Sequence, residues 1–206
     1  MKIELTNVGK RFNEEWIFRK ADLQFEAGNS YAITGPNGSG KSTLLQIIGG
    51  LQQASVGSVS YTTGGSIIPT ERAFRHISFA APYLEVIEEF TLTEFLRFHV
   101  QFKGILAGVD VKNIIKEVEL ESAADKQIRY FSSGMKQRVK LAQAIFSNTS
   151  LVLLDEPCSN LDVAGIELYH SLIQRHCKDR IVIVCSNDPV EYSFCQKVIS
   201  ITDFKS

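Results

Sequence analysis

The sequence has no apolar run that approaches the ~20 residues needed to cross a bilayer as a helix. Its first residues alternate in polarity as a strand does, and they lack the apolar core of a signal peptide. Basic and acidic side chains nearly cancel, with a formal net charge of −1, so composition gives no electrostatic reason to expect a nucleic-acid partner. We therefore expect a globular protein that does not span a membrane itself.

Cysteine is scarce, and no two cysteines have the Cys-x-x-Cys spacing of a metal or redox site. We expect the four thiols to be reduced, as in cytosolic proteins. The sequence also contains no repeat, no low-complexity segment and no Asn-Lys-x-Asp motif for guanine. With 206 residues, 44% of them hydrophobic, the chain is long enough for one sizeable core, or for one core and a subdomain.

A glycine-rich loop is the most informative segment that is present. Residues 35–43 fit the pattern of a glycine, four residues and Gly-Lys-Ser/Thr, between a short apolar strand and an apolar helix. Backbone N–H groups and the helix dipole of such a loop hold phosphate oxygens. Lys41 is placed to reach the β- and γ-phosphates, and Ser42 to ligate Mg²⁺. The alternative is a glycine-rich turn that binds nothing. The predicted phosphate ligands are Gly35, Asn37, Gly38, Ser39, Gly40, Lys41, Ser42 and Thr43.

Two kinds of strand are predicted from the distribution of apolar residues. Continuous runs rich in Val, Ile and Leu favour a mostly parallel sheet that is covered on both faces. Shorter segments close to Gly or Asn favour an antiparallel arm beside it. The parallel strands are expected at 30–34, 151–154, 181–185 and 198–201, and the arm at 3–7, 22–26 and 57–61.

Apolar residues at helical spacing predict four longer helices, at 92–102, 110–119, 133–147 and 163–177. The first three lie close together in the sequence and interrupt the alternation of strand and helix. We therefore predict an α/β fold in which residues 1–83 and 149–206 form the phosphate-binding core with its arm. Residues 84–148 are predicted to form a helical subdomain.

Two acidic residues follow one of the predicted parallel strands. Asp155 comes directly after the apolar run at 151–154, and ligands of α/β sheets bind at this carboxyl end of the strands. Asp155 is therefore placed to hold Mg²⁺, and Glu156 to accept a proton from an attacking water. The alternative for this pair is a solvated helix N-cap.

The segment Phe131–Arg138, which we call the signature segment, opens a predicted helix with small residues. Free N–H groups at such a helix start can meet an anion, although an ordinary capped helix would look the same.

Taken together, these motifs resemble those of the ATP-binding cassette (ABC) ATPases, and the resemblance extends over essentially the whole chain. Residues 35–43 look like the family's Walker A motif, and 151–156 look like Walker B. Phe-Ser-Ser-Gly-Met at 131–135 resembles a variant of the Leu-Ser-Gly-Gly-Gln signature, and Ser-Asn-Leu-Asp at 159–162 resembles the D-loop. Phe12 occupies the position of the aromatic residue that stacks on adenine. The resemblance implies a P-loop NTPase fold with ATP and Mg²⁺ as cofactors.

In that family two cassettes pair head to tail, so that each signature closes over the ATP held by the other. The resemblance therefore implies further ATP contacts across a dimer. The residues that it places there are Ser132, Ser133, Gly134 and Asp162.

The sequence departs from the family at two catalytic positions. A Gln usually ends the strand that enters the helical insertion, and counting back from Thr91 places that position at Pro82. Asn187 stands where the family has a His that contacts the γ-phosphate. Because Asn187 lies just past the strand at 181–185, we expect its side chain to face the γ-phosphate as a third catalytic group with Glu156 and Lys41; the alternative is a turn or helix-capping Asn.

The function implied is an ATP-hydrolysing motor subunit of an ABC transporter. It would pair with a second copy or a homologous cassette and drive a separate polytopic membrane permease, from the cytoplasmic face of the cell membrane. Two alternatives stay open: an ATP-dependent dimerisation switch with little turnover, which Pro82 and Asn187 motivate, and a soluble ABC protein without a transport role.

Overall fold

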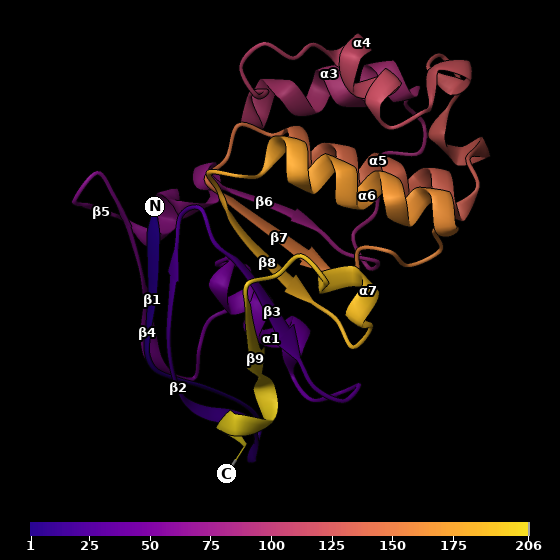
Figure 1. Ribbon diagram of the computed structural model, residues 1–206. Coiled ribbons are helices and arrows are strands. Elements are labelled where there is room, and N and C mark those ends of the chain that lie inside the picture. Colours follow the sequence, from indigo (N-terminus) through magenta and orange to yellow (C-terminus); the bar gives the residue numbers. More distant parts are fainter. Residues whose placement is uncertain (206) are drawn as a thin grey trace.

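The computed structural model describes residues 1–205, and its centre is a parallel sheet of five strands in the order β6-β7-β8-β3-β9 (Figure 1). The predicted parallel sheet is therefore confirmed, with one strand, β6, that the apolar runs did not predict. The strands are β3 (Ser30–Thr34), β6 (Ile77–Ala80), β7 (Leu151–Asp155), β8 (Ile181–Cys185) and β9 (Lys197–Ser200).

A second, antiparallel sheet of four strands lies beside the first, in the order β2-β1-β4-β5 (Figure 1). It is the predicted arm, but its strands are longer than the sequence indicated. A tight hairpin at Asn13, whose φ is +53°, joins the two longest strands and places Phe12 opposite Glu15. The strands are β1 (Lys2–Phe12), β2 (Glu15–Glu26), β4 (Val56–Thr63) and β5 (Ser66–Ile68).

The helices divide between the two faces of the parallel sheet (Figure 1). Helix α1 packs between this sheet and the arm, whereas α3 to α6 gather on the opposite face. The four predicted longer helices are confirmed to within a few residues at their ends. The helices are α1 (Lys41–Ile48), α2 (Thr70–Ala73), α3 (Leu92–Lys103), α4 (Val111–Glu117), α5 (Ser133–Phe146), α6 (Val163–His176) and α7 (Pro189–Tyr192). No helix in residues 1–205 is both long and apolar enough to cross a membrane.

Two hydrophobic clusters explain why the central strands are apolar throughout. In β7, Leu151 and Leu153 pack toward α1 and the arm, whereas Val152 and Leu154 pack toward α3 to α6. Because successive strand side chains point to opposite faces, a strand buried on both faces needs an apolar residue at every position. Core residues of the segment 84–148 belong to the same cluster as Val152 and Leu154. The boundaries of a separate helical subdomain stay a prediction.

The first turns of three helices are fixed by side-chain caps. Thr91 and Glu94 form a capping box at the start of α3. The hydroxyl of the nearby Thr93 donates to Ala124 O at 3.0 Å. Ser132 Oγ accepts from Met135 N at 3.2 Å to begin α5. Asp162 Oδ1 accepts from Gly165 N at 2.8 Å to begin α6. The caps thus set where the signature segment and the D-loop turn into helix.

A buried arginine joins the end of α5 to the parallel sheet. Arg180 is 7% exposed, and its guanidinium donates to the carbonyl of Ile145 at 2.5 Å. It also donates to Thr149 Oγ1 at 2.6 Å and to Ser78 Oγ at 3.3 Å. The carbonyl at a helix C-terminus carries partial negative charge, so the end of α5 stabilises this cation.

Candidate functional site

The glycine-rich loop, Gly35 to Thr43, joins the carboxyl end of β3 to α1 and packs under the β1–β2 hairpin. We call it the phosphate loop. Gly40 has a φ of +102°, and a Cβ there would lie 2.4 Å from Ile17 Cγ2 of the hairpin. No side chain fits that space, and the left-handed backbone is one that glycine adopts without strain. The close approach of the hairpin therefore requires glycine at this position.

Lys41 is buried at the first position of α1, and its side chain turns back into the phosphate loop. Its Nζ donates to Gly35 O at 2.7 Å and to Pro36 O at 3.2 Å. The ammonium is therefore held at the centre of the loop by carbonyl dipoles. An anion that enters the loop meets a fixed positive charge together with the N–H groups at the start of α1.

Asp155 ends β7 and is 2% exposed. Burial raises the pKa of its carboxyl above the usual range, and hydrogen bonding from the hydroxyls of Ser42 and Tyr83 opposes part of that rise. Neither hydroxyl completes a hydrogen bond to Oδ2, which is buried and lacks a partner within residues 1–205. A buried carboxylate oxygen without a donor is costly, so this atom suits a cation.

Glu156 follows Asp155 and has a left-handed backbone, with φ at +44°. Its N–H donates to Cys185 O at 2.9 Å, which ties this turn to the end of β8. The unusual backbone leaves the side chain exposed, at the mouth of a hollow of about 290 Å³. Strained backbone of this kind is concentrated at functional sites. The hollow is lined by Phe12, Ile17, Asn37 to Thr43 and Glu156.

Phe12 stands at the rim of the same hollow, on the β1 side of the hairpin. Its ring is 47% exposed, and Lys10 Nζ lies 5.0 Å from the ring centroid. A half-exposed aromatic face beside an anion-binding loop is the arrangement that base stacking requires. The structure thus brings together Phe12, the phosphate loop and Glu156, and Asp155 lies next to Ser42 of the loop.

Asn187 lies directly on the phosphate loop. Its Oδ1 accepts from Gly35 N at 3.2 Å, and its Nδ2 donates to Asn37 Oδ1 at 2.9 Å. It does not cap the helix that follows, because the N-cap of α7 is Asp188, whose carboxylate accepts from Val190 N. The helix-capping alternative for Asn187 is therefore wrong, and its side chain braces the loop that holds Lys41.

The signature segment borders a different hollow, of about 420 Å³, which shares no lining residue with the one at the phosphate loop. Ser132, Ser133 and Gly134 line it together with the end of the D-loop at Asp162. Arg138 of α5 connects the two, since its NH2 lies 3.9 Å from Asp162 Oδ1. The two hollows are therefore separate in one copy of the chain.

Sequence counting placed the missing glutamine at Pro82, but a neighbouring residue lies beside the acids. The carbonyl of Pro82 accepts from Lys140 Nζ at 2.8 Å, so this residue contacts α5. The hydroxyl of Tyr83 lies near Asp155 and accepts from Gln46 Nε2 at 3.0 Å. Burial raises the pKa of Tyr83 to about 12, so the phenol stays protonated. Sequence reasoning missed Tyr83 and Gln46.

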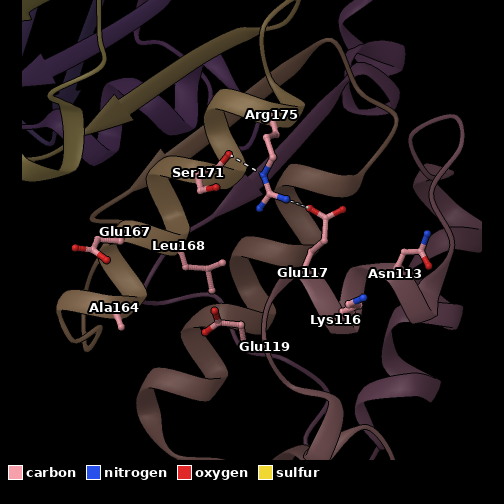
Figure 2. A pocket seen from close by; sticks show the side chains of 9 residues that line it. All are labelled: Asn113, Lys116, Glu117, Glu119, Ala164, Glu167, Leu168, Ser171 and Arg175. Carbon is pink, nitrogen blue, oxygen red and sulfur yellow. Dashed lines mark hydrogen bonds and ion pairs between the residues drawn. The ribbon is translucent and has the colours of Figure 1, made fainter.

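A larger hollow, of about 710 Å³, lies between α4 and α6 and contains no residue of the phosphate loop (Figure 2). Arg175 of α6 reaches across it, with NH1 3.0 Å from Glu117 Oε2, while its Nε donates to Ser171 O (Figure 2). One ion pair, Arg175 with Glu117, thus spans the hollow. The residues predicted to bind phosphate instead line the smaller hollow at the phosphate loop.

Known proteins resemble this chain in sequence and in fold. The sequence profile of the ABC transporter family matches residues 18–159. The cytochrome c biogenesis ATP-binding export protein CcmA of Brucella abortus is 32% identical over 194 residues, which cover 92% of this chain and 87% of that protein.

Two solved structures superpose on most of the chain. The dimeric, post-hydrolysis structure of an ATP-binding cassette bound to ADP and Pi has a TM-score of 0.82 at 26% identity, covering 96% of this chain and 93% of that one. A putative ABC transporter ATP-binding protein from Pyrococcus furiosus has a TM-score of 0.84 at 23% identity and covers 100% of both chains, which supports the fold.

Proposed function

The chain belongs to the ABC transporter family as an ATP-hydrolysing cassette, and from that premise we propose how its own residues bind and hydrolyse ATP. The observation that carries the proposal is the hollow that combines Phe12, the phosphate loop and Glu156. Phosphoryl transfer uses a phosphate cradle and a group that orients the attacking water, and an exposed aromatic face can stack on a base. A cassette without a transport role is not favoured, because its named relatives include export proteins.

We assign the triphosphate to the phosphate loop and the adenine to Phe12. Lys41 would exchange its bonds with the carbonyls of Gly35 and Pro36 for the β- and γ-phosphates, which are stronger acceptors. The N–H groups at the start of α1 would bind the remaining phosphate oxygens. Asn187 would keep the loop open for this exchange through its bonds to Gly35 and Asn37.

Mg²⁺ fits the Ser42 hydroxyl and the Asp155 carboxylate. Asp155 Oδ2 is a buried oxygen without a donor, and hard oxygen ligands of this kind are what Mg²⁺ prefers. Within residues 1–205 no group of three or more His, Cys, Asp or Glu side chains could enclose a metal by itself. Phosphate and water would supply the other ligands of the Mg²⁺. When bound, the ion would neutralise charge that develops on the phosphates.

Glu156 is the group that we assign to proton transfer. Its side chain is exposed at the mouth of the hollow, so it can reach a water that attacks the γ-phosphate. Its left-handed backbone and the bond from its N–H to Cys185 O hold it there. Glu156 would thus orient the water and accept its proton.

We infer that two copies of the chain pair, because the two hollows of one copy are separate. The phosphate loop and the signature segment border separate hollows, so one copy leaves the γ-phosphate side of its nucleotide open to solvent. A second copy arranged head to tail would cover it with Ser132, Ser133 and Gly134, and Asp162 would lie beside the contact. Closure of this kind excludes water from the reacting groups.

We propose that the membrane subunit docks on an exposed aromatic surface formed by Phe98 and Phe102 of α3 and by Phe74, whose ring lies 5.4 Å from Lys103 Nζ of the same helix. Phe74 is 55% exposed and Phe102 is 66% exposed, and the rings of Phe98 and Phe102 lie 4.9 Å apart. Exposed clusters of aromatic rings mark protein interfaces, since isolated proteins rarely leave them in water. The cassette would then work at the inner face of the membrane that holds this subunit.

The pairing proposal is tested with Glu156→Gln, which keeps the shape of the side chain but cannot accept a proton. We expect this variant to bind Mg-ATP and to accumulate as a dimer in light scattering, because the closed state is no longer opened by hydrolysis. Glu167→Gln, an exposed position on α6, is the matched control and should behave as the wild type. If Glu156→Gln binds Mg-ATP yet keeps the mass of one chain at every protein concentration, the pairing proposal is wrong.

A further inference from the structure

Tyr83 lies where three parts of the structure meet, just beyond the end of β6. Its hydroxyl accepts a hydrogen bond from Gln46 Nε2 of α1 at 3.0 Å. The same hydroxyl lies close enough to Asp155 at the end of β7 to act on its carboxyl. The backbone just before it is held by α5, through Lys140 Nζ and the carbonyl of Pro82 at 2.8 Å.

Within residues 1–205 the phenol of Tyr83 makes one hydrogen bond, to Gln46. A tyrosine hydroxyl has one proton to donate and also accepts. Gln46 satisfies the accepting side, which leaves the proton of Tyr83 free. Asp155 Oδ2 is buried and accepts no hydrogen bond from residues 1–205. The phenol and the unsatisfied carboxylate oxygen therefore belong to neighbouring side chains, and no hydrogen bond joins them within residues 1–205.

Tyr83 is 48% exposed, and its side chain has a neighbour at the ring and another at the hydroxyl. Its ring packs at a tilt on Phe79 of β6, with the centroids 6.4 Å apart. Gln46 fixes the oxygen end of the same side chain. A side chain held at both ends can orient a neighbouring carboxylate without a large loss of conformational freedom.

We propose that Tyr83 is the positioning residue for Asp155: its O–H, held by Gln46, orients the carboxylate toward the Mg²⁺ that accompanies ATP. The inference rests on the proposed function above and assigns a role to two residues that the family's pattern does not supply. Tyr83 does not ligate the metal in this arrangement, since its proton is directed to the carboxylate.

The backbone before Tyr83 also contacts the helix that begins in the signature segment. Lys140 holds Pro82 and Ala81, with Nζ 2.8 Å and 3.4 Å from their carbonyls, and it belongs to the helix that begins at Ser133. One short stretch of backbone therefore lies between the Tyr83 side chain and α5.

The test is the affinity for ATP measured with Mg²⁺ and again with EDTA, which separates metal-dependent from metal-independent binding. Tyr83→Phe keeps the ring and removes the hydroxyl. We expect its Kd for Mg-ATP to rise about 3- to 10-fold, as for the loss of one hydrogen bond, while its Kd in EDTA stays that of the wild type. Gln46→Met should act in the same direction, and the double variant should be no weaker than either alone.

Tyr61→Phe is the matched control, because it also removes a hydroxyl that bonds to α1. Tyr61 donates to Ile48 O at 2.9 Å, at the far end of that helix from Asp155. We expect it to lower thermal stability and to leave the Mg²⁺ dependence of ATP binding unchanged. Thermal unfolding without nucleotide establishes that each variant is folded.

Other results would contradict either the positioning role of Tyr83 or the proposed function. If Tyr83→Phe binds Mg-ATP as tightly as the wild type, or loses affinity equally in Mg²⁺ and in EDTA, the positioning role is wrong. The same holds if Tyr61→Phe loses Mg²⁺ dependence to the same extent. A wild-type chain that binds ATP in neither condition would instead refute the proposed function itself.

Discussion

Replacing Phe12 with alanine should weaken ATP binding, and the size of the effect follows from the exposed area of the ring. Burial of an aromatic side chain removes roughly 150–250 Å² from water, and the ring of Phe12 is 47% exposed. About 100 Å² is therefore left for a stacked base. At about 25 cal/mol per Å², covering that area contributes about 2.5 kcal/mol, close to the ~1–3 kcal/mol known for base–aromatic stacking.

We expect the Kd for Mg-ATP to rise about 5- to 150-fold in Phe12→Ala, as measured by calorimetric titration. Inorganic triphosphate carries the phosphates without the base, so its affinity should not change. Phe102→Ala is the matched control, because Phe102 is also an exposed phenylalanine but lies on α3, outside the nucleotide hollow.

The reasoning is refuted if Phe12→Ala binds ATP as tightly as the wild type and unfolds at a lower temperature. That result would mean that the ring packs into the arm and that the base lies elsewhere. Equal losses for ATP and for triphosphate would also refute it, because the effect would then lie in the phosphate loop.

Substitutions at three further positions test two other residues of the site and one histidine of α3. Lys41→Ala should lose most ATP affinity, since each charge-assisted hydrogen bond is worth ~1.5–3 kcal/mol; titration showing wild-type affinity would contradict the phosphate assignment. Asn187→Ala should lower steady-state ATP turnover because it frees Gly35 and Asn37, and Asn187→His should preserve or raise it; equal rates in all three proteins would remove Asn187 from catalysis. Burial lowers the pKa of His99 to about 4, so the unfolded chain takes up this proton first and stability falls as the pH drops from about 6.5 to about 4. Unfolding of His99→Gln, followed against pH, should show a flatter decline, and an unchanged slope would contradict this assignment.

Much of the fold follows from local patterns in the sequence. The runs at 151–154 and 181–185 predict buried parallel strands because every residue in them is apolar, and both faces of β7 and β8 are indeed covered. The phosphate loop was predictable because its glycines and Lys41 stand at fixed spacing. The arm was placed correctly but its length was not, since β1 and β2 contain register shifts that alternation does not reveal.

The contacts that brace the site could not be read from the sequence. Asn187 and Gly35 are 152 residues apart, and Tyr83 and Gln46 are 37 apart, so only the folded chain brings them together. Counting along the loop placed the missing glutamine at Pro82, one residue from the side chain that lies near Asp155. No local rule distinguishes these two positions, because the turn after β6 decides which side chain faces β7.

The buried guanidinium of Arg180 should make three parts of the structure unfold together. It donates to the last turn of α5, to Ser78 of β6 and to Thr149 before β7. Opening any one of these elements removes one acceptor from a buried cation, so the three should not open independently. Their amide protons should exchange with solvent in one cooperative step, and α5 should not fray from its C-terminal end ahead of the sheet.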